Sequence, residues 1–244
     1  MKKSYAAKYH ILEKYHWWFL GRRDIIYKLI KHFYRDIDIL EVGCSGGLLI
    51  GFLQMRGFKN LIGIDIDHEA IELCRQTGIT NVFVRDAEKT GFEDQQFDII
   101  IASDILEHMK DEDKTLLEWH RILKPKGELL VFVPAFNFLW SKHDEVNYHY
   151  RRYSKSRLLS ILQKNGFKVK RISYWNFSLF FPVTIVRLFQ RLLSGNRSSG
   201  DQLYDVNIFV NRTLEYLLGL ENKVLSLGIN LPLGISIFAR AGKT

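Results

Sequence analysis

Short apolar runs alternate with helical periods along the chain from residue 37 onward. The apolar runs predict buried strands, which fall at 37–42, 61–65, 82–84, 97–102, 128–133, 168–174 and 235–239. Between them, apolar residues at three- and four-residue spacing predict helices, which fall at 48–56, 69–76, 113–123 and 154–165. Such alternation is typical of a parallel sheet with helices on both faces. We therefore expect an α/β fold.

The last two predicted strands are separated by a stretch of about 60 residues, which is too long for a bare loop. Within this stretch, 183–193 and 206–225 carry apolar residues at helical spacing. We expect a helical insertion over 175–232 on a single domain that spans 1–244, with a helical lid or cap over 1–34.

The composition is that of a folded protein, because 47% of the residues are hydrophobic and 25% are charged. A cluster of glycine, asparagine and serine at 194–200 predicts a flexible connector. Cys44 and Cys74 lack the spacing of a zinc site or of a disulfide framework, which favours a reducing cytoplasm. The longest apolar run, 172–186, is too short to cross a bilayer, and charged residues at 8–14 interrupt any signal sequence. We expect a cytoplasmic protein that can contact a membrane peripherally.

A glycine-rich turn at 43–47 follows the first predicted strand. Such a turn serves ligands that lie against backbone, because a side chain there would collide with them. Ser45 stands where a dinucleotide fingerprint requires its second glycine. Glu41 would repel a pyrophosphate at the start of the following helix, whereas a ligand with ammonium and sulfonium cations would tolerate it. The turn therefore argues against NAD.

Acidic residues follow the second and third predicted strands. Asp65 ends the second strand, where sheets of this kind direct an acid at ribose hydroxyls. Asp86 follows the third strand, and its side chain could accept from an exocyclic amine such as that of adenine. A solvated surface aspartate is the alternative for Asp86.

Taken together, the segments 41–47, 63–67, 86–88, 97–102 and 123–127 resemble the ordered motif series of class I S-adenosyl-L-methionine (SAM)-dependent methyltransferases. The resemblance implies a Rossmann-like seven-stranded mixed sheet whose last strand is antiparallel, SAM as cofactor, and S-adenosyl-L-homocysteine as product. It implies a cofactor site formed by Glu41, Gly43, Cys44, Ser45, Gly47, Asp65, Ile66, Asp86, Ala87 and Ser103. Ser45 departs from the family, which usually has glycine there, but serine is small enough to keep the turn.

Segments outside this core resemble a bacterial and archaeal group close to the methyltransferase type 11 and type 23 families. The matching segments are 16–19 with Arg22 and Arg23, then 139–141, 144–145 and 149–153, and finally 174–177. This resemblance implies no particular substrate.

Candidates for handling the methyl acceptor follow the fourth and fifth strands, at the sheet edge where such folds bind ligands. In-line displacement from a sulfonium requires orientation of the acceptor and, for a hydroxyl, removal of its proton. Asp104, His108 and His149 are suitably placed. Asp104-x-x-Glu107-His108 resembles a magnesium-binding pattern of some O-methyltransferases, but an imidazole is an atypical magnesium ligand, so we expect no metal.

We expect methyl transfer, at oxygen, to a small-molecule or to a lipid- or saccharide-linked acceptor. The alternatives are an RNA methyltransferase, suggested by the net charge of +8, and a non-catalytic interaction protein. No nucleic-acid-binding module is recognisable, so nucleic acid is not the expected partner. The aromatic segment 16–19 is either a lid or a packed helix, and Arg22, Arg23, Arg151 and Arg152 either bind an anionic acceptor or pair with local acids. Residues 175–232 contact a membrane, a second copy or the core, and the oligomeric state stays open.

Overall fold

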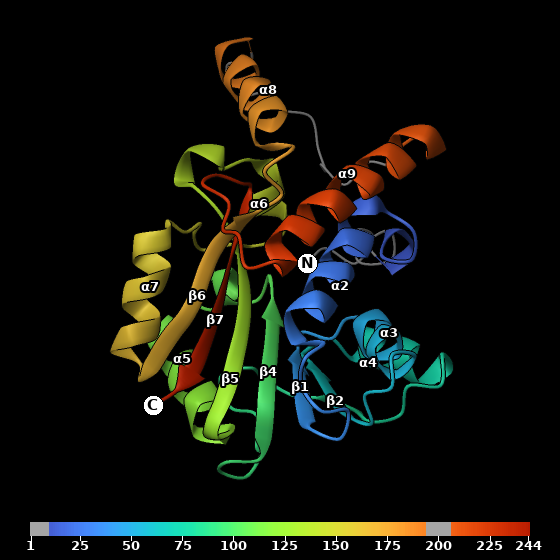
Figure 1. The fold of residues 1–244 in the computed structure, drawn as a ribbon, viewed down its shortest axis with the longest axis vertical. Coiled ribbons are helices and arrows are strands. Elements are labelled where there is room, and N and C mark those ends of the chain that lie inside the picture. Colours follow the sequence, from blue (N-terminus) through green and yellow to red (C-terminus); the bar gives the residue numbers. More distant parts are fainter. Residues whose placement is uncertain (1–9, 194–205) are drawn as a thin grey trace.

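The computed structural model describes residues 10–193 and 206–244, so the predicted connector at 194–200 and the first residues of the expected cap lie outside the described residues. Seven strands form one sheet in the order β3-β2-β1-β4-β5-β7-β6 (Figure 1). They are β1 (Asp38–Val42), β2 (Asn60–Asp65), β3 (Val82–Val84), β4 (Phe97–Ser103), β5 (Leu123–Pro134), β6 (Phe167–Trp175) and β7 (Ser236–Lys243). β1 to β5 pair in parallel, and β7 runs antiparallel between β5 and β6. The expected Rossmann-like mixed sheet is confirmed.

The strand β5 begins earlier than its apolar run predicted. The sequence predicted a helix to residue 123 and a strand from residue 128, yet β5 starts at Leu123, which pairs with Phe97 and precedes Pro125. The register shifts between Phe97 and Ile99, and this irregularity tolerates a proline that cannot donate to the ladder. A Cβ at Gly127 would lie 2.9 Å from the Lys124 carbonyl oxygen, so the close approach requires glycine.

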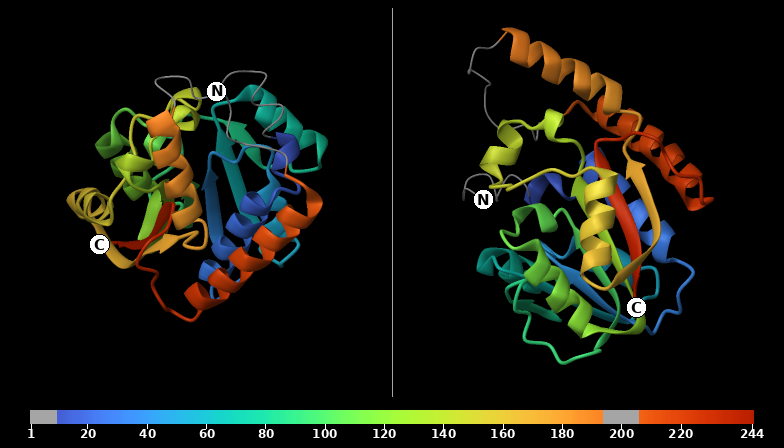
Figure 2. Two further views of the ribbon diagram at one scale, coloured as in Figure 1. Left: turned by 90° about the horizontal axis from the view of Figure 1, so that it is seen from above. Right: turned by 90° about the vertical axis from the view of Figure 1, so that its left-hand side faces the viewer.

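Helices cover both faces of the sheet, as the alternating pattern predicted (Figures 1 and 2). The α-helices are α2 (Trp17–Ile30), α3 (Leu48–Gln54), α4 (His68–Gln76), α5 (Glu112–Ile122), α6 (Lys142–Val146), α7 (Lys155–Lys164), α8 (Phe180–Leu193) and α9 (Ile208–Ser226). Two short 3-10 helices, η1 (Leu106–His108) and η2 (Asn137–Leu139), follow β4 and β5. One core cluster joins the sheet to α2, α3, α4 and α9, and the other joins it to α5 and α7. The helices α2, α3, α4, α5, α7 and α9 therefore bury apolar residues on the sheet or on a neighbouring helix.

The expected insertion forms α8 and α9, and α9 packs along the N-terminal helix α2 (Figures 1 and 2). Asn211 of α9 accepts a hydrogen bond from the Trp17 amide at 2.9 Å. Asn222 donates to the Gly21 carbonyl oxygen at 2.8 Å. Leu218 lies so close to Gly21 that a Cβ there would be 2.2 Å from its Cδ2 atom. Helix α2 of the N-terminal cap and helix α9 of the insertion thus pack directly on each other.

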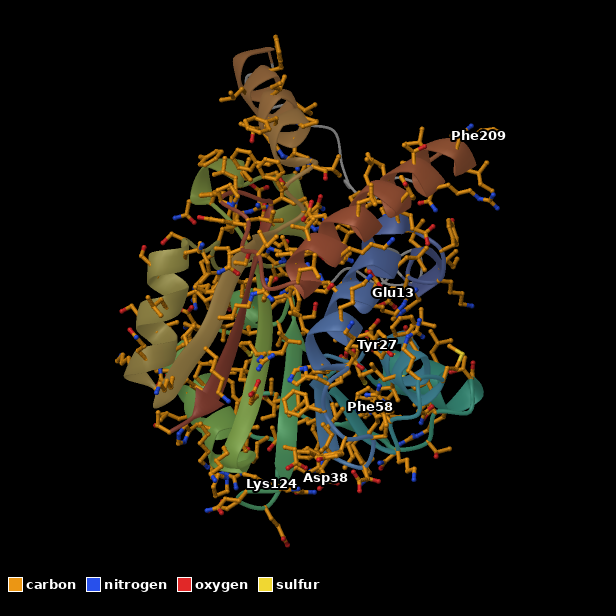
Figure 3. All side chains as sticks on the ribbon, in the orientation of Figure 1. Glu13, Tyr27, Asp38, Phe58, Lys124 and Phe209 are labelled. Carbon is orange, nitrogen blue, oxygen red and sulfur yellow. The ribbon has the colours of Figure 1, made fainter. Side chains whose placement is uncertain are left out.

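The parallel strands all end at the same edge of the sheet, toward α6, α8 and α9 (Figure 1). At the opposite edge of the sheet, Lys124 Nζ donates to Asp38 and Asp98, both at 2.7 Å. Figure 3 shows Lys124 and Asp38 side by side at this edge. Among the described residues, no helix has both the length and the apolarity that crossing a bilayer requires. Because ligands of open α/β sheets bind at the carboxyl ends of the strands, ligand access is expected at that edge.

Candidate active site at the carboxyl edge of the sheet

A cavity of about 870 Å³ lies at the carboxyl ends of the parallel strands. Gly43 and Asp65, which follow β1 and end β2, contribute to one part of its lining. Trp17 and Trp18 of α2 and Val183 of α8 contribute to the rest, together with residues that follow β4 and β5. The cavity therefore joins the predicted cofactor turn to the helical insertion.

The turn after β1 adopts backbone conformations that favour glycine. Gly43 has a φ of +74°, and a Cβ there would lie 2.0 Å from Ile105 Cδ1. Gly47 has a φ of +75°, and a Cβ there would be 2.8 Å from Ile79 Cδ1. Ser45 also has a positive φ, 47°, a conformation that costs a residue other than glycine about 1 kcal/mol. The turn was expected to persist because serine is small. The positive φ at this position explains why the family usually has glycine there.

Hydrogen bonds hold Ser45 in this conformation. Its hydroxyl donates to Glu13 Oε2 at 2.8 Å, and its amide donates to Asp65 Oδ2 at 2.9 Å. Asp65 also accepts from the Asp67 amide at 3.0 Å. Burial raises the pKa of Asp65, and the hydrogen bonds from Asp67 and Ser45 oppose that shift. Each carboxylate oxygen can accept more than one hydrogen bond, so Asp65 keeps capacity for a hydroxyl.

Half of the predicted cofactor residues contribute to the cavity lining, namely Gly43, Ser45, Asp65, Ile66 and Ser103. The other half do not, and these are Glu41, Cys44, Gly47, Asp86 and Ala87.

Two acids in the second group differ in their surroundings. Glu41 is buried, its Oε2 atom has no hydrogen-bond partner among the described residues, and burial raises its pKa well above the usual range. Asp86 is exposed and accepts from the Glu88 amide at 2.8 Å. The roles of these residues toward the cofactor stay predictions.

Asp104, His108 and His149, the predicted acceptor-handling residues, all line the cavity. The rings of His108 and His149 meet edge to face with centroids 4.6 Å apart. Burial lowers the pKa of His108 to about 4, so its ring is neutral at pH 7. His149 Nδ1 lies 2.9 Å from Asp144 Oδ1, and Asp144 also accepts from Arg152 Nε at 2.8 Å. Both histidine rings thus line the cavity, and that of His149 is held in place by the Asp144 carboxylate.

Asp104 is engaged with Arg22. The Arg22 Nη1 atom donates to Asp104 Oδ2 and to Ser103 Oγ, both at 2.7 Å. The guanidinium lies 4.3 to 4.5 Å from the ring centroids of three aromatic residues, which are Trp18, Phe132 and Trp175. Of the two interpretations of the arginines, pairing with a local acid applies to Arg22, which pairs with Asp104, and to Arg152, which pairs with Asp144.

The sequence analysis named Glu107 within the acidic pattern before His108 but did not place it among the expected site residues. Glu107 is fully buried, contributes to the cavity lining, and neither of its carboxylate oxygens has a hydrogen-bond partner among the described residues. Leu179, Val183 and Arg187, from α8 and the segment before it, also line the cavity. No local pattern places these three residues at the site, because only tertiary packing brings the insertion to the sheet edge.

The aromatic segment 16–19 both packs and lines the cavity. Trp17 is 9% exposed and Phe19 is 5% exposed, yet both contribute to the lining. The Trp18 ring lies 5.9 Å from that of Trp175 and 4.9 Å from that of Phe19. The lid and packing interpretations are therefore compatible.

Comparisons with known proteins agree with this geometry. Residues 40–131 match a family model described as a methyltransferase domain. The chain is 32% identical over 117 residues to a ubiquinone biosynthesis O-methyltransferase of Rickettsia bellii, a match that covers 45% of this chain and 48% of that protein. The chain thus spans about half the length of the curated relatives it matches.

Solved structures share the fold over most of the chain. A SAM-dependent methyltransferase of Archaeoglobus fulgidus is 19% identical with a TM-score of 0.63, and the match covers 97% of this chain and 99% of that one. A geranyl diphosphate methyltransferase solved with SAM is 12% identical with a TM-score of 0.62, covering 92% and 85%. The sheet order, the glycine turn and these matches define a class I methyltransferase fold. Residues 40–131 are therefore similar to the methyltransferase domain family, and the chain as a whole has the class I methyltransferase fold.

Proposed function

We propose that the protein transfers the methyl group of SAM to an oxygen of a small-molecule or a lipid- or saccharide-linked acceptor. The observation that carries the proposal is that one cavity contains both the glycine turn with Asp65 and a cluster of two histidines and a buried glutamate. The cofactor and the methyl acceptor can therefore bind side by side in one cavity. In-line displacement requires such proximity between the methyl group and the attacking oxygen.

The residues at the turn fit SAM. Gly43 lines the cavity at a place where a side chain would collide with Ile105, Asp65 can accept from ribose hydroxyls, and Oε2 of the buried Glu41 lacks a hydrogen-bond partner among the described residues. The Glu41 carboxylate would therefore attract the ammonium and sulfonium cations of SAM, by direct contact or through its electrostatic field. Bound SAM supplies an electrophilic methyl group on a positively charged sulfur.

The protein's part in the reaction is then to orient the acceptor and to exclude water. Trp17, Trp18 and Val183 supply apolar surface around the cavity. Glu107, His108 and His149 supply the polar groups that would contact an acceptor hydroxyl. A dry cavity strengthens each of these polar contacts, because fewer water dipoles compete with them.

The insertion supports a lipid-linked acceptor. On α8, Val183 lines the cavity, whereas Phe181, Ile185 and Phe189 are each more than half exposed. On α9, Phe209 is 78% exposed and lies near the outer end of the helix (Figure 3). An apolar helix that connects the outer surface with the cavity wall would let an acceptor reach the site from a membrane. We include peripheral membrane contact through 175–232 in the proposal.

Binding of SAM tests the first half of the proposal. Calorimetric titration of the purified full chain should show one SAM site, and Asp65→Ala should weaken binding at least about tenfold because the ribose loses its acceptor. Asp113→Ala is the matched control, since Asp113 pairs with Lys164 on the surface between α5 and α7. If Asp65→Ala bound SAM as well as wild type, the proposed cofactor site would be wrong.

Methyl transfer tests the second half. The full chain should transfer labelled methyl groups from SAM to hydroxyl-bearing acceptors presented in detergent or in vesicles. Transfer into RNA alone, with none into the small-molecule or lipid fraction, would contradict the proposed acceptor class.

A further inference from the structure

Three potential ligand groups converge at one end of the cavity. Glu107 and His108 come from η1 after β4, and His149 comes from the loop after α6. Each offers one ligand atom, and these atoms all lie within 4.8 Å of one another. The ligand atoms of a tetrahedral zinc site lie about 3.4 Å apart, so these three atoms would have to approach one another by up to about 1.4 Å to hold the ion.

Glu107 lacks the partner that a buried carboxyl group requires. Its side chain is fully buried, and neither oxygen has a hydrogen-bond partner among residues 10–193 and 206–244. The nearby cations Arg22 and Arg152 are already paired, with Asp104 and with Asp144. A buried carboxylate without a partner is strongly unfavourable, and a protonated one would still need an acceptor for its proton. A divalent cation would satisfy both oxygens.

Both histidines are oriented by other groups as metal ligands usually are. Asp144 binds His149 at Nδ1, which leaves Nε2 for a metal. Asp144 is itself fixed by Arg152 and by the Ser141 amide, which donates to Oδ2 at 2.8 Å. His108 is hydrogen-bonded to the backbone of Asn147, which fixes the orientation of its ring.

We propose that Glu107, His108 and His149 bind a divalent transition-metal cation of the zinc or manganese type beside the methyl acceptor. Two imidazoles and one carboxylate leave coordination positions open for a substrate, whereas magnesium prefers oxygen ligands throughout. The set differs from the pattern noted in the sequence, because Asp104 is paired with Arg22 and His149 takes the remaining place.

The site gives the acceptor a route to activation, and this step rests on the proposed function. A hydroxyl oxygen that binds the cation has a lowered pKa and loses its proton to solvent water. The oxygen lone pair then forms the bond to the methyl carbon, and the electron pair of the carbon–sulfur bond goes to sulfur. The products are the methyl ether, neutral S-adenosyl-L-homocysteine and one proton.

Metal binding can be measured without any activity assay. Tag-free full chain, stripped with chelator, should bind one equivalent of Mn²⁺ by electron paramagnetic resonance and one of Zn²⁺ by competition with a chromophoric chelator. Glu107→Gln and His149→Ala should abolish the stoichiometric site. Asp144→Asn leaves all three ligands in place but removes the charge that orients His149 and pairs with Arg152, and it should weaken binding about 10- to 100-fold. Asp113→Asn, at the α5–α7 surface, should bind as wild type does.

Binding of SAM to the same variants separates this proposal from the proposed function and shows that each variant is folded. Stoichiometric SAM binding with no metal site in the wild type would overturn the metal proposal and leave the proposed function standing. A metal site without SAM binding would overturn the function instead. Glu107→Gln and His149→Ala that bind SAM and retain wild-type metal affinity would also overturn the assignment of ligands.

Discussion

Replacing Arg22 by methionine is expected to destabilise the protein, because Arg22 is a buried cation that pairs with Asp104 of the cavity lining. It is 4% exposed, donates to Asp104 and Ser103, and lies among three aromatic rings. Methionine keeps most of the apolar contact but leaves Asp104 without its partner. Removing one member of a buried pair costs about 3 to 5 kcal/mol, and we expect about 3 kcal/mol because the Asp104 side chain is 24% exposed.

The assay is urea denaturation followed by far-UV circular dichroism, together with thermal unfolding. In a chain of this length, about 3 kcal/mol lowers Tm by about 6 to 12 °C. Arg75→Met is the matched control, since Arg75 is 47% exposed in a surface pair with Glu72 and should change the unfolding free energy by less than about 0.5 kcal/mol.

A double-mutant cycle tests the physical cause. Arg22→Met combined with Asp104→Asn should cost less than the sum of the single changes, by about 1 kcal/mol or more, because both variants remove the same interaction. Strict additivity, or a loss below about 0.5 kcal/mol for Arg22→Met, would refute the reasoning that this pair stabilises the site.

Three further predictions concern binding. Burial raises the pKa of Glu41, so binding of the cationic cofactor should ionise this carboxyl group and release a proton. The heat of SAM binding should then vary with the ionisation enthalpy of the buffer for wild type but not for Glu41→Gln. Equal buffer dependence in both proteins would contradict this assignment. In vesicle flotation with anionic lipid, a Phe181→Ser, Phe189→Ser double variant should bind more weakly than wild type, whereas Tyr34→Ser, at a position 84% exposed, should not change binding. Despite the net charge of +8, the full chain should show no tight RNA binding at low salt, and a steep loss of RNA affinity with added salt would favour the RNA alternative.

Much of the core could be predicted because it depends on neighbours along the chain. The apolar runs located every strand of the sheet, and the glycines at 43 and 47 marked the ligand turn through their conformational freedom. The start of β5 was missed, because the irregular pairing of Leu123 with Phe97 is a property of two strands and not of either segment alone.

The candidate site was only partly predictable for the same reason. His108 and His149 were identified by their positions after strands, but the paired state of Asp104 depends on Arg22, which is 82 residues away. The isolation of Glu107 depends on the absence of a partner among all described segments that fold around it. The wall formed by α8 depends on how the insertion crosses the sheet edge.

Local periodicity and backbone conformation act over a few residues, so the sequence by itself determined the order of strands and helices, the turn after β1 and the acid that ends β2. The packing of α9 on α2, the pairing of Arg22 with Asp104 and the convergence of His149 on Glu107 and His108 were decided only by the tertiary structure. Such contacts join segments far apart in the chain, and they form where close packing of the whole core brings complementary groups within bonding distance.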